Sequence, residues 1–378
     1  MIATYALDGH LAHPVTAACE LSRRLPAVVL VGLSSASARE VVTRLRGALA
    51  AHRWEWPRQR VELSVDRAGS APTAYDLPLA VALLVASGQI SAEPLAGLAL
   101  YGELSLSGEV RGVRGTVAAA QAAAAAGQVL VTGPGPGADL AARLGLPVAV
   151  LRSLGELREG TPARHAVEAS VLPPDPFDFA DIHGQDPSLL DRLVEAARTR
   201  APLLLLGPPG CGKIMLAARL GGILPTLTRD EDLQVCARHD VVGLTFLEGG
   251  RRPFRAPHHT ISTVGLVGRP GYADAPMRFG EIDLANEGVL LLDELLEFPR
   301  ATLEALGHAL AEPGRRVWLV VSASVVPGTR DEERLARQLR ALQIKPEVIP
   351  LRRIPHSEVV EGSAWPTSAS LRARVGAA

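Results

Sequence analysis

A glycine-rich segment at residues 207–213 has the residue types and spacing that phosphate binding requires. It consists of Gly207, Pro208, Pro209, Gly210, Cys211, Gly212 and Lys213. The segment fits the pattern G-x-x-x-x-G-K and stands between an apolar run, residues 203–206, and a helical pattern, residues 215–220. In such a loop the backbone amides surround a β-phosphate, the lysine reaches the β- and γ-oxygens, and the helix N-terminus adds positive charge. The segment therefore predicts a site for ATP or a related nucleoside triphosphate, rather than a chance glycine-rich turn.

The lysine usage of the chain supports this prediction. Lys and Arg together number 39, yet only Lys213 and Lys345 are lysines. A compact, flexible ammonium differs chemically from a planar guanidinium. We therefore expect Lys213 to occupy a position where arginine would not serve.

A second motif supplies two carboxylates that could act on a bound triphosphate. The apolar run at residues 288–292 ends in Asp293 and Glu294, as a buried parallel strand ending in two acids would. Asp293 would hold Mg²⁺, and Glu294 would orient and deprotonate the attacking water. We expect this strand to be the neighbour of the strand that precedes Gly207. The alternative is that the acids face solvent or begin a helix at Pro299.

Ile214 departs from the phosphate-binding pattern. It occupies the place of the Ser or Thr whose hydroxyl normally binds Mg²⁺. Because Mg²⁺ tolerates water in its octahedral shell, nucleotide binding could survive while the metal is positioned more loosely.

The histidine-containing run at residues 252–260 leaves alternatives open. His258 and His259 could suggest a zinc site, but adjacent histidines point to different sides of most backbones and no third ligand has suitable spacing. We expect a loop near the nucleotide or at a subunit boundary.

Two tryptophans also permit two interpretations. Trp54 and Trp56 stand among arginines and could stack on single-stranded nucleic acid. The alternative is that they belong to the core while the arginines face solvent.

The composition is that of an ordinary globular protein. The 378 residues are 47% hydrophobic and 21% charged, with a formal net charge of −1, so no global field favours nucleic acid or an anionic membrane. Cys19, Cys211 and Cys236 show no paired spacing and are expected to be reduced thiols. We find no signal-peptide pattern and no membrane-spanning apolar run. We expect a cytoplasmic protein with no membrane partner.

The pattern along the chain predicts two domains. Residues 1–158 alternate short apolar runs with helical patterns, which is typical of an α/β domain. Residues 159–179 are proline-rich without periodicity and are expected to form a linker. Residues 180–329 hold both nucleotide motifs and predict a P-loop domain with a parallel sheet. Beyond residue 329 the pattern weakens, and we expect an atypical tail over 330–378 that is frayed after residue 361.

Several motifs in order carry a family resemblance. In the first half they are Val31-Gly32-Leu33, Tyr75-Asp76-Leu77-Pro78-Leu79-Ala80, Gly102-Glu103-Leu104 and Val113-Arg114-Gly115. In the second half they are Asp181-Ile182-His183-Gly184-Gln185, the glycine-rich loop, residues 252–262 and residues 280–298. With these motifs, up to about residue 328, the chain resembles the ComM/YifB family of bacterial magnesium-chelatase-like AAA+ proteins.

The resemblance implies a fold, a site and partners. It implies a Lon-protease-like N-terminal α/β domain without peptidase activity, joined to an AAA+ P-loop NTPase domain. Residues 1–212 contain no lysine, so the Ser–Lys dyad of Lon-type cleavage cannot form there. It also implies that Ile182 and His183 lie beside the nucleotide. The resemblance to ComM further implies a ring-forming, DNA-stimulated branch-migration helicase, with single-stranded or branched DNA and a homo- or mixed hexameric ring as partners.

The chain departs from the family in ways that bear on catalysis. Ser324 stands where the family usually has a sensor asparagine, and the stretch before Trp318 is shorter than the family's pore hairpin. Nothing after residue 329 resembles the family's helical lid with its arginines, and an arginine finger contributes about 10³ to 10⁵ in rate. Arg330, Arg334 or Arg337 could substitute. These departures predict a truncated or degenerate member of the family.

The leading hypothesis is an ATP-binding AAA+ protein with impaired hydrolysis. One alternative is a fully active, DNA-stimulated ATPase and helicase ring in DNA uptake and recombination. Another is a non-catalytic nucleotide-binding partner in an assembly. A chelatase subunit of tetrapyrrole synthesis fits only the second half of the chain.

Overall fold

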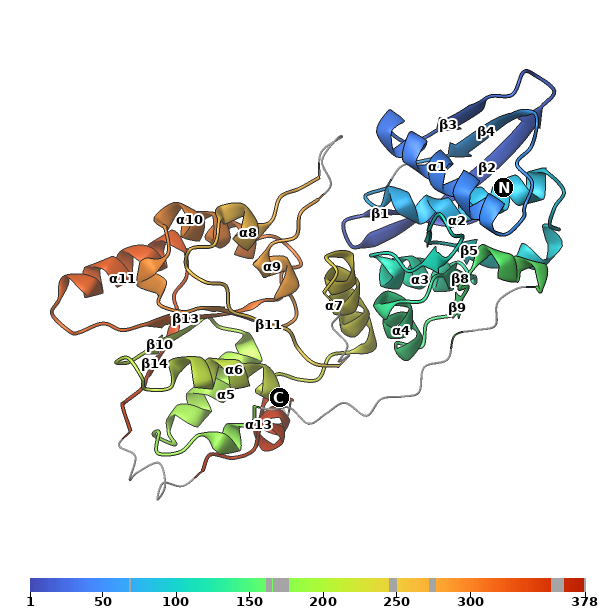
Figure 1. The fold of residues 1–378 in the computed structure, drawn as a ribbon. Helices are drawn as coiled ribbons and strands as arrows, with labels where there is room; N and C mark the ends of the chain where they lie inside the picture. The colour runs from blue at the N-terminus through green and yellow to red at the C-terminus, as the bar shows by residue number, and fades with distance from the viewer. Residues whose placement is uncertain are drawn as a thin grey trace. The chain divides into compact units, whose positions relative to one another are not determined.

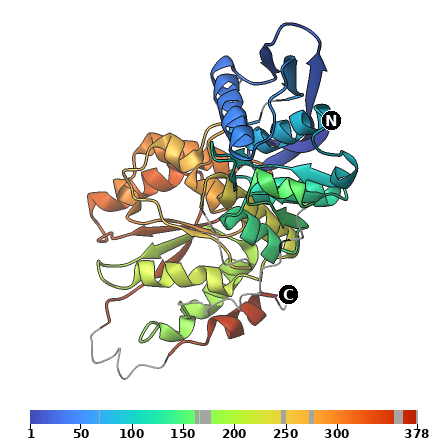
Figure 2. The same cartoon turned by 45° about the vertical axis from the view of Figure 1, so that its right-hand side comes forward.

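The computed structural model describes residues 1–67, 69–160, 165, 177–244, 250–271, 277–354 and 364–376. The chain divides into two compact units (Figures 1 and 2). Each unit has hydrophobic core clusters of its own. The first unit comprises most of residues 1–171 with the short stretches 236–249 and 272–277, and the second comprises the remainder. Both units are α/β folds, which confirms the predicted class. Among the described helices, none combines the length and apolar character needed to cross a bilayer.

The first unit is built on a seven-stranded mixed sheet. Its order is β3-β4-β2-β1-β5-β8-β9. The strands are β1 (Ile2–Asp8), β2 (Leu11–Ser22), β3 (Val28–Val31), β4 (Arg60–Val65), β5 (Leu98–Leu100), β8 (Val129–Thr132) and β9 (Val148–Val150). β2 is antiparallel to β1 and β4, and the other pairs are parallel. A separate antiparallel pair joins β6 (Glu103–Leu104) and β7 (Val110–Arg111).

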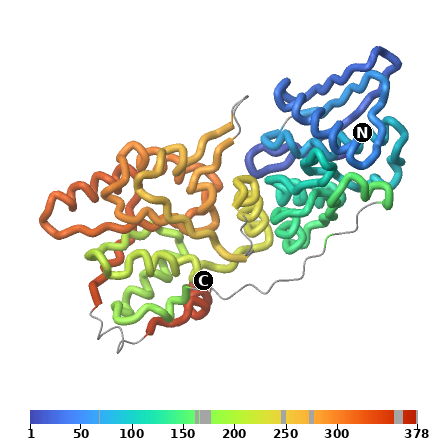
Figure 3. The backbone as a smooth tube through the Cα atoms, in the orientation of Figure 1, coloured from blue at the N-terminus to red at the C-terminus, as the bar shows by residue number. Residues whose placement is uncertain are grey.

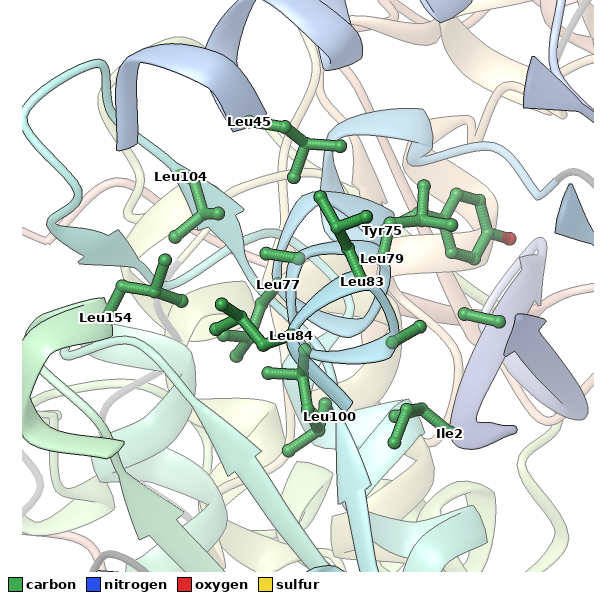
Figure 4. Close-up of a cluster of buried hydrophobic side chains, with 14 of the residues drawn as sticks. Ile2, Leu45, Tyr75, Leu77, Leu79, Leu83, Leu84, Leu100, Leu104 and Leu154 are labelled. Carbon is green, nitrogen blue, oxygen red and sulfur yellow. The ribbon is translucent and has the colours of Figure 1, made fainter. Parts of the chain in front are cut away.

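Four complete α-helices lie in the described part of this unit. They are α1 (Ser35–Ala51), α2 (Asp76–Ala86), α3 (Thr116–Ala125) and α4 (Pro136–Arg143). Apart from Asp76 at its first position, α2 is apolar on every side and lies in the middle of the core, where its leucines meet Leu45 of α1 and Leu100 of β5 (Figure 4). A helix that is hydrophobic all round is stable only when buried in this way.

The second unit is built on a five-stranded parallel sheet. Its order is β11-β12-β13-β10-β14. The strands are β10 (Leu203–Leu206), β11 (Phe254–Arg255), β12 (Val289–Leu292), β13 (Trp318–Ala323) and β14 (Glu347–Pro350). The expectation that the acid-bearing strand β12 is the neighbour of β10 is wrong, because β13 lies between them.

Helices cover both faces of this sheet (Figure 1). One face carries α5 (Leu189–Thr199), α6 (Lys213–Ile223) and α13 (Ser368–Gly376), and the other carries α8 (Thr263–Val267), α9 (Glu281–Leu284), α10 (Arg300–Leu310) and α11 (Arg330–Ala341). Leu203 and Leu205 face the first layer while Leu204 faces the second, as the two-residue period of a strand requires. α7 (Arg229–Val241) follows α6 along the chain.

Short 3₁₀ helices lie in the segments that connect the strands and α-helices. They are η1 (Pro72–Tyr75), η2 (Glu93–Leu95), η3 (Leu154–Arg158), η4 (Phe179–Asp181) and η5 (Leu295–Glu297).

The region after residue 329 differs from the expected tail. It forms α11, then β14, which extends the sheet beside β10, and finally α13. Leu371 and Val375 of α13 are buried in the core shared with α5 and α6. The tube in Figure 3 shows α13, in red near the C-terminus, beside the green segment that holds α5 and α6. The sequence prediction failed here because β14 and α13 are short, and the contacts that stabilise them come from segments distant in the sequence. Most of the linker predicted at 159–179 lies outside the described residues.

Candidate functional site

The glycine-rich loop connects the end of β10 directly to the start of α6. Gly210 has φ of +78° and Gly212 has φ of +90°, a backbone region that glycine adopts at little cost. These two turns curl the chain, so the segment is a compact loop. Lys213 is the first residue of α6, and the amides of the helix N-terminus therefore open toward the loop.

Gly207 is required by close packing. A Cβ at this position would lie 2.5 Å from the carbonyl oxygen of Leu351 and 2.7 Å from Sγ of Cys211. The chain that follows β14 therefore runs directly against the first glycine of the loop.

Lys213 is the chemical centre of the loop. The residue is only 8% exposed, and its ammonium donates to the carbonyl oxygens of Gly207 at 2.8 Å and Pro208 at 3.1 Å. It also donates to Oγ of Ser324 at 2.9 Å. An ammonium has three N–H donors, and all three are satisfied by these contacts. The charge is thus fixed at the loop, where the oxygens of a phosphate could replace these acceptors.

The two predicted acids lie at the same edge of the sheet. Asp293 and Glu294 follow β12 directly, and the carboxyl ends of parallel strands share one edge. The hydroxyl of Ser322 donates to the Asp293 carboxylate and accepts the backbone N–H of Glu294 at 3.0 Å. β13 therefore links the two motifs, because Ser324 contacts Lys213 and Ser322 contacts Asp293.

Sequence reasoning missed Ser322. Its side chain is completely buried, and it stands two positions before Ser324, so the two-residue period of a strand places both hydroxyls on one side. That spacing was the available signal.

Glu294 has an unusual backbone. It is a non-glycine residue with φ of 54° and ψ of 59° and is exposed to solvent. Left-handed backbone at such a residue costs roughly 1–2 kcal/mol and is found preferentially at functional sites. The hydrogen bond from its N–H to Ser322 helps to hold this conformation.

The residues present fit a nucleotide better than they fit a tightly held metal. The loop amides and Lys213 suit phosphate oxygens. Asp293 offers one carboxylate to Mg²⁺, a number typical of nucleotide sites in which phosphates and water complete the shell. Ile214, 55% exposed on α6, has no oxygen to offer. Bound Mg²⁺ would supply charge neutralisation of the phosphates.

Ile182 and His183 lie in a segment that contacts the loop. The side chain of Ile182 is buried in the core of the second unit, and His183 is partly exposed. Two residues further, the Gln185 side chain donates to the carbonyl oxygen of Cys211 at 3.2 Å. Gln185 was not singled out as a site residue, because its contact partners are distant in the sequence.

The start of the same segment is fixed to α6 by charge. The Arg219 guanidinium donates to the Asp181 carboxylate at 2.8 Å and to the carbonyl oxygen of Asp178 at 2.8 Å. The hydrogen bond from Arg219 holds the pKa of Asp181 below its usual value.

The histidine pair belongs to the same edge of the sheet. His258 and His259 follow β11, with ring centroids 3.9 Å apart, and His259 meets the ring of Phe298 edge-on. Since β11 is parallel to β12, its carboxyl end lies on the side of Asp293. A role at a subunit boundary stays a prediction.

The tryptophans belong to the core of the first unit. Trp54 is buried and the Arg158 guanidinium covers its ring at 3.9 Å, while Arg46 lies 4.8 Å from the ring of Trp56. These contacts favour the core interpretation over stacking on nucleic acid.

Two arginines considered as substitutes for an arginine finger make contacts within their own unit. Arg334 pairs with Asp331 at 3.0 Å, and Nε of Arg337 donates to the Glu333 carbonyl oxygen at 3.4 Å. Their role in catalysis stays a prediction.

Comparison with known families matches both halves of the chain. The model "Magnesium chelatase, subunit ChlI" matches residues 178–318, and the model "Subunit ChlI of Mg-chelatase" matches residues 18–133. The first match contains the glycine-rich loop and both acids.

Several curated proteins are similar along most of the chain. YifB of Salmonella typhimurium is 37% identical over 318 residues, which cover 81% of this chain and 61% of that protein. Mb2921c of Mycobacterium bovis is 38% identical, with 82% and 63% covered. The competence protein ComM of Haemophilus influenzae is 35% identical, with 78% and 60% covered. The aligned part of the chain thus spans about three fifths of the length of these relatives.

Among solved structures, NtrX from Brucella abortus in complex with ADP is 18% identical. The match covers 48% of this chain and 39% of NtrX with a TM-score of 0.29, a value too low to support an argument.

Proposed function

The chain belongs to the ComM/YifB family of magnesium-chelatase-like proteins, and from this premise we propose that it binds ATP with Mg²⁺ and hydrolyses it slowly. The observation that carries the proposal is the position of Lys213, a buried ammonium at the mouth of a parallel sheet. The acids at the end of β12 stand at the same edge.

Binding would exchange one set of acceptors for another. The ammonium of Lys213 now donates to two carbonyl oxygens and one hydroxyl. Phosphate oxygens carry formal charge, and hydrogen bonds to ionised acceptors are roughly twice as strong as those to neutral ones. The exchange is therefore favourable, and the N-terminus of α6 adds to it.

Four features support slow hydrolysis. Ile214 offers no hydroxyl to Mg²⁺. The short side chain of Ser324 stands at the sensor position and is engaged by Lys213. The Asp293 carboxylate already accepts a hydrogen bond from Ser322. Glu294 would act as the base that orients water, and its exposure to solvent weakens that role because exclusion of water strengthens electrostatic catalysis.

The proposal is tested by separating binding from turnover. We expect wild-type protein to bind a fluorescent ATP analogue, and Lys213→Ala to weaken that binding at least about a hundredfold because a charge-assisted contact is lost. Glu294→Gln should bind as well as wild type. Lys213→Ala protein that bound the analogue normally would remove the site assignment.

Phosphate release from the same proteins distinguishes the alternatives. Slow release that depends on Glu294 supports the proposal. Rapid release that single-stranded or branched DNA stimulates would instead support an active DNA-remodelling ring, of the kind that the competence relative suggests. Binding without any release would indicate a non-catalytic partner in a homo- or mixed hexameric ring. A cytoplasmic location stays part of the proposal.

A further inference from the structure

The two sides of β10 are different, and this difference orients a bound nucleotide. On one side lies β13, and Ser324, the residue directly after it, contacts Lys213, so the terminal phosphates belong on that side. The nucleoside end must leave the loop in another direction. On the opposite side of β10 lies β14, followed by Leu351, which packs against Gly207.

Gln185 joins three segments on this opposite side. Its side-chain amide donates to the carbonyl oxygen of Cys211 in the loop at 3.2 Å and to that of Arg352 at 2.9 Å. Its side-chain oxygen accepts the backbone N–H of Arg352 at 3.4 Å. The residue is only 8% exposed, so these hydrogen bonds are shielded from water and costly to lose.

Trp365, near the C-terminal end of the chain, also contacts the segment that holds Gln185. Trp365 is 3% exposed; its backbone N–H donates to the carbonyl oxygen of Ile182 at 3.0 Å, and its indole N–H donates to that of Gln185 at 3.4 Å. Its ring stacks on Phe179, with centroids 6.0 Å apart.

α13 anchors this arrangement to the helix that begins at the loop. Arg372 donates to the carbonyl oxygen of Gly222 in α6 at 2.9 and 2.7 Å. Ser368 accepts the N–H of Phe179 at 3.0 Å. Residues 178–185 are thus held on one side by the loop and α6, and on the other by the C-terminal chain.

We propose that residues 351–352 and 364–376 form a C-terminal clasp that fixes the wall on the nucleoside side of the site. Gln185 is the positioning residue that ties the clasp and this wall to the loop. The inference rests on the proposed nucleotide function and deepens it. On this proposal the region after residue 329 helps to form the nucleotide site.

The test compares two ligands on the full-length protein. Inorganic tripolyphosphate has only the phosphate oxygens that the loop would bind, whereas ATP also has a nucleoside that would contact the wall. We expect Gln185→Ala to weaken ATP binding about tenfold, because the substitution removes the three side-chain hydrogen bonds that tie the wall to the loop and to Arg352. We expect it to weaken tripolyphosphate binding less than about twofold. Competition against a fluorescent ATP analogue measures both affinities.

Gln338→Ala is the matched control. Gln338 lies in the same unit, and its side-chain amide donates to the carbonyl oxygen of Phe298 at 2.9 Å, away from the loop. We expect this variant to bind both ligands as wild type does.

The outcomes separate the two proposals. Wild-type protein that bound neither ligand would overturn the nucleotide function itself. The clasp would be overturned if the wild type bound both ligands and Gln185→Ala lost affinity equally for both, or lost no affinity for either. The proposed nucleotide function would stand in that case.

A milder variant covers the case in which Gln185→Ala does not fold. Trp365→Phe removes the indole donor to the Gln185 carbonyl oxygen and keeps an aromatic ring to stack on Phe179. We expect a smaller loss, about two- to threefold, again selective for ATP over tripolyphosphate. An unchanged ratio of the two affinities would contradict the clasp.

Discussion

Ile214 is the residue whose chemistry most limits the proposed site. It is exposed on the first turn of α6, directly after Lys213, where an oxygen ligand would serve Mg²⁺. Ile and Thr have similar helix propensities, so Ile214→Thr should leave the fold intact. We expect the Mg²⁺ concentration for half-maximal phosphate release to fall about tenfold, the scale of effects seen at metal ligands and their supports. A magnesium titration of phosphate release measures this change.

Met215→Thr is the control for that substitution. It places the same hydroxyl one residue further along α6, at a position that is also partly exposed, and should leave the magnesium dependence unchanged. If both variants shifted equally, or neither did, the missing hydroxyl would not be what limits metal positioning.

At the scale of elements, a buried ion pair joins α1 and α2. Arg44 of α1 donates to both carboxylate oxygens of Asp76, at 2.6 and 3.1 Å, and the N–H of Leu104 in β6 donates at 3.1 Å. Burial raises the pKa of Asp76 to about 6 although Arg44 opposes the shift. The cost of desolvating the Asp76 carboxylate therefore exceeds its attraction to Arg44. The pair contributes more to how α1 and α2 pack together than to the stability of the unit.

Breaking one side of that pair should be costly. Asp76→Ala leaves the half-buried guanidinium of Arg44 and the N–H of Leu104 without their acceptor, and we expect a loss of about 3 kcal/mol in the free energy of unfolding. Urea denaturation of the first unit measures it. The more exposed pair Arg60–Glu62 provides the comparison, because Glu62→Ala should cost less than about 1 kcal/mol. Equal losses in the free energy of unfolding would show that the burial of Asp76 does not determine how much the protein loses when this carboxylate is removed.

At the scale of the whole molecule, the two units have separate cores. Among the described residues, the core around α2 is built from residues up to 157, and the cores on either side of the parallel sheet are built from residues from 179 onward. Units with independent cores can unfold as separate cooperative transitions. The residues of the proposed nucleotide site all lie in the second unit.

Nucleotide should accordingly stabilise only one unit. At a free concentration of about 100 times Kd, ATP adds about 2.7 kcal/mol to the stability of the unit that binds it. In differential scanning calorimetry we expect one transition to rise with ATP and the other to stay fixed, and Asp76→Ala to lower the fixed one. Lys213→Ala should abolish the ATP-dependent rise. A single transition that moves as a whole would mean that the units unfold together.

The sequence by itself determined the parts of this protein that are contiguous. The glycine-rich loop lies between β10 and α6 as predicted, Asp293 and Glu294 end a buried strand, and both units are α/β folds. These features are readable because a few neighbouring residues specify them. A phosphate loop needs its glycines and lysine at fixed local spacing, and a buried parallel strand needs only a short apolar run.

Only the tertiary structure decided how those parts meet. In the tertiary structure β13 lies between the two motifs, and Ser322 contacts Asp293. The region that was expected to be an atypical tail contributes β14 and α13 to the second unit. Gln185 contacts Arg352, which is 167 residues away in the sequence. Contacts of this kind leave no local sequence pattern. Each partner is stabilised by packing against a distant segment, and the residues next to it in the sequence do not specify that segment.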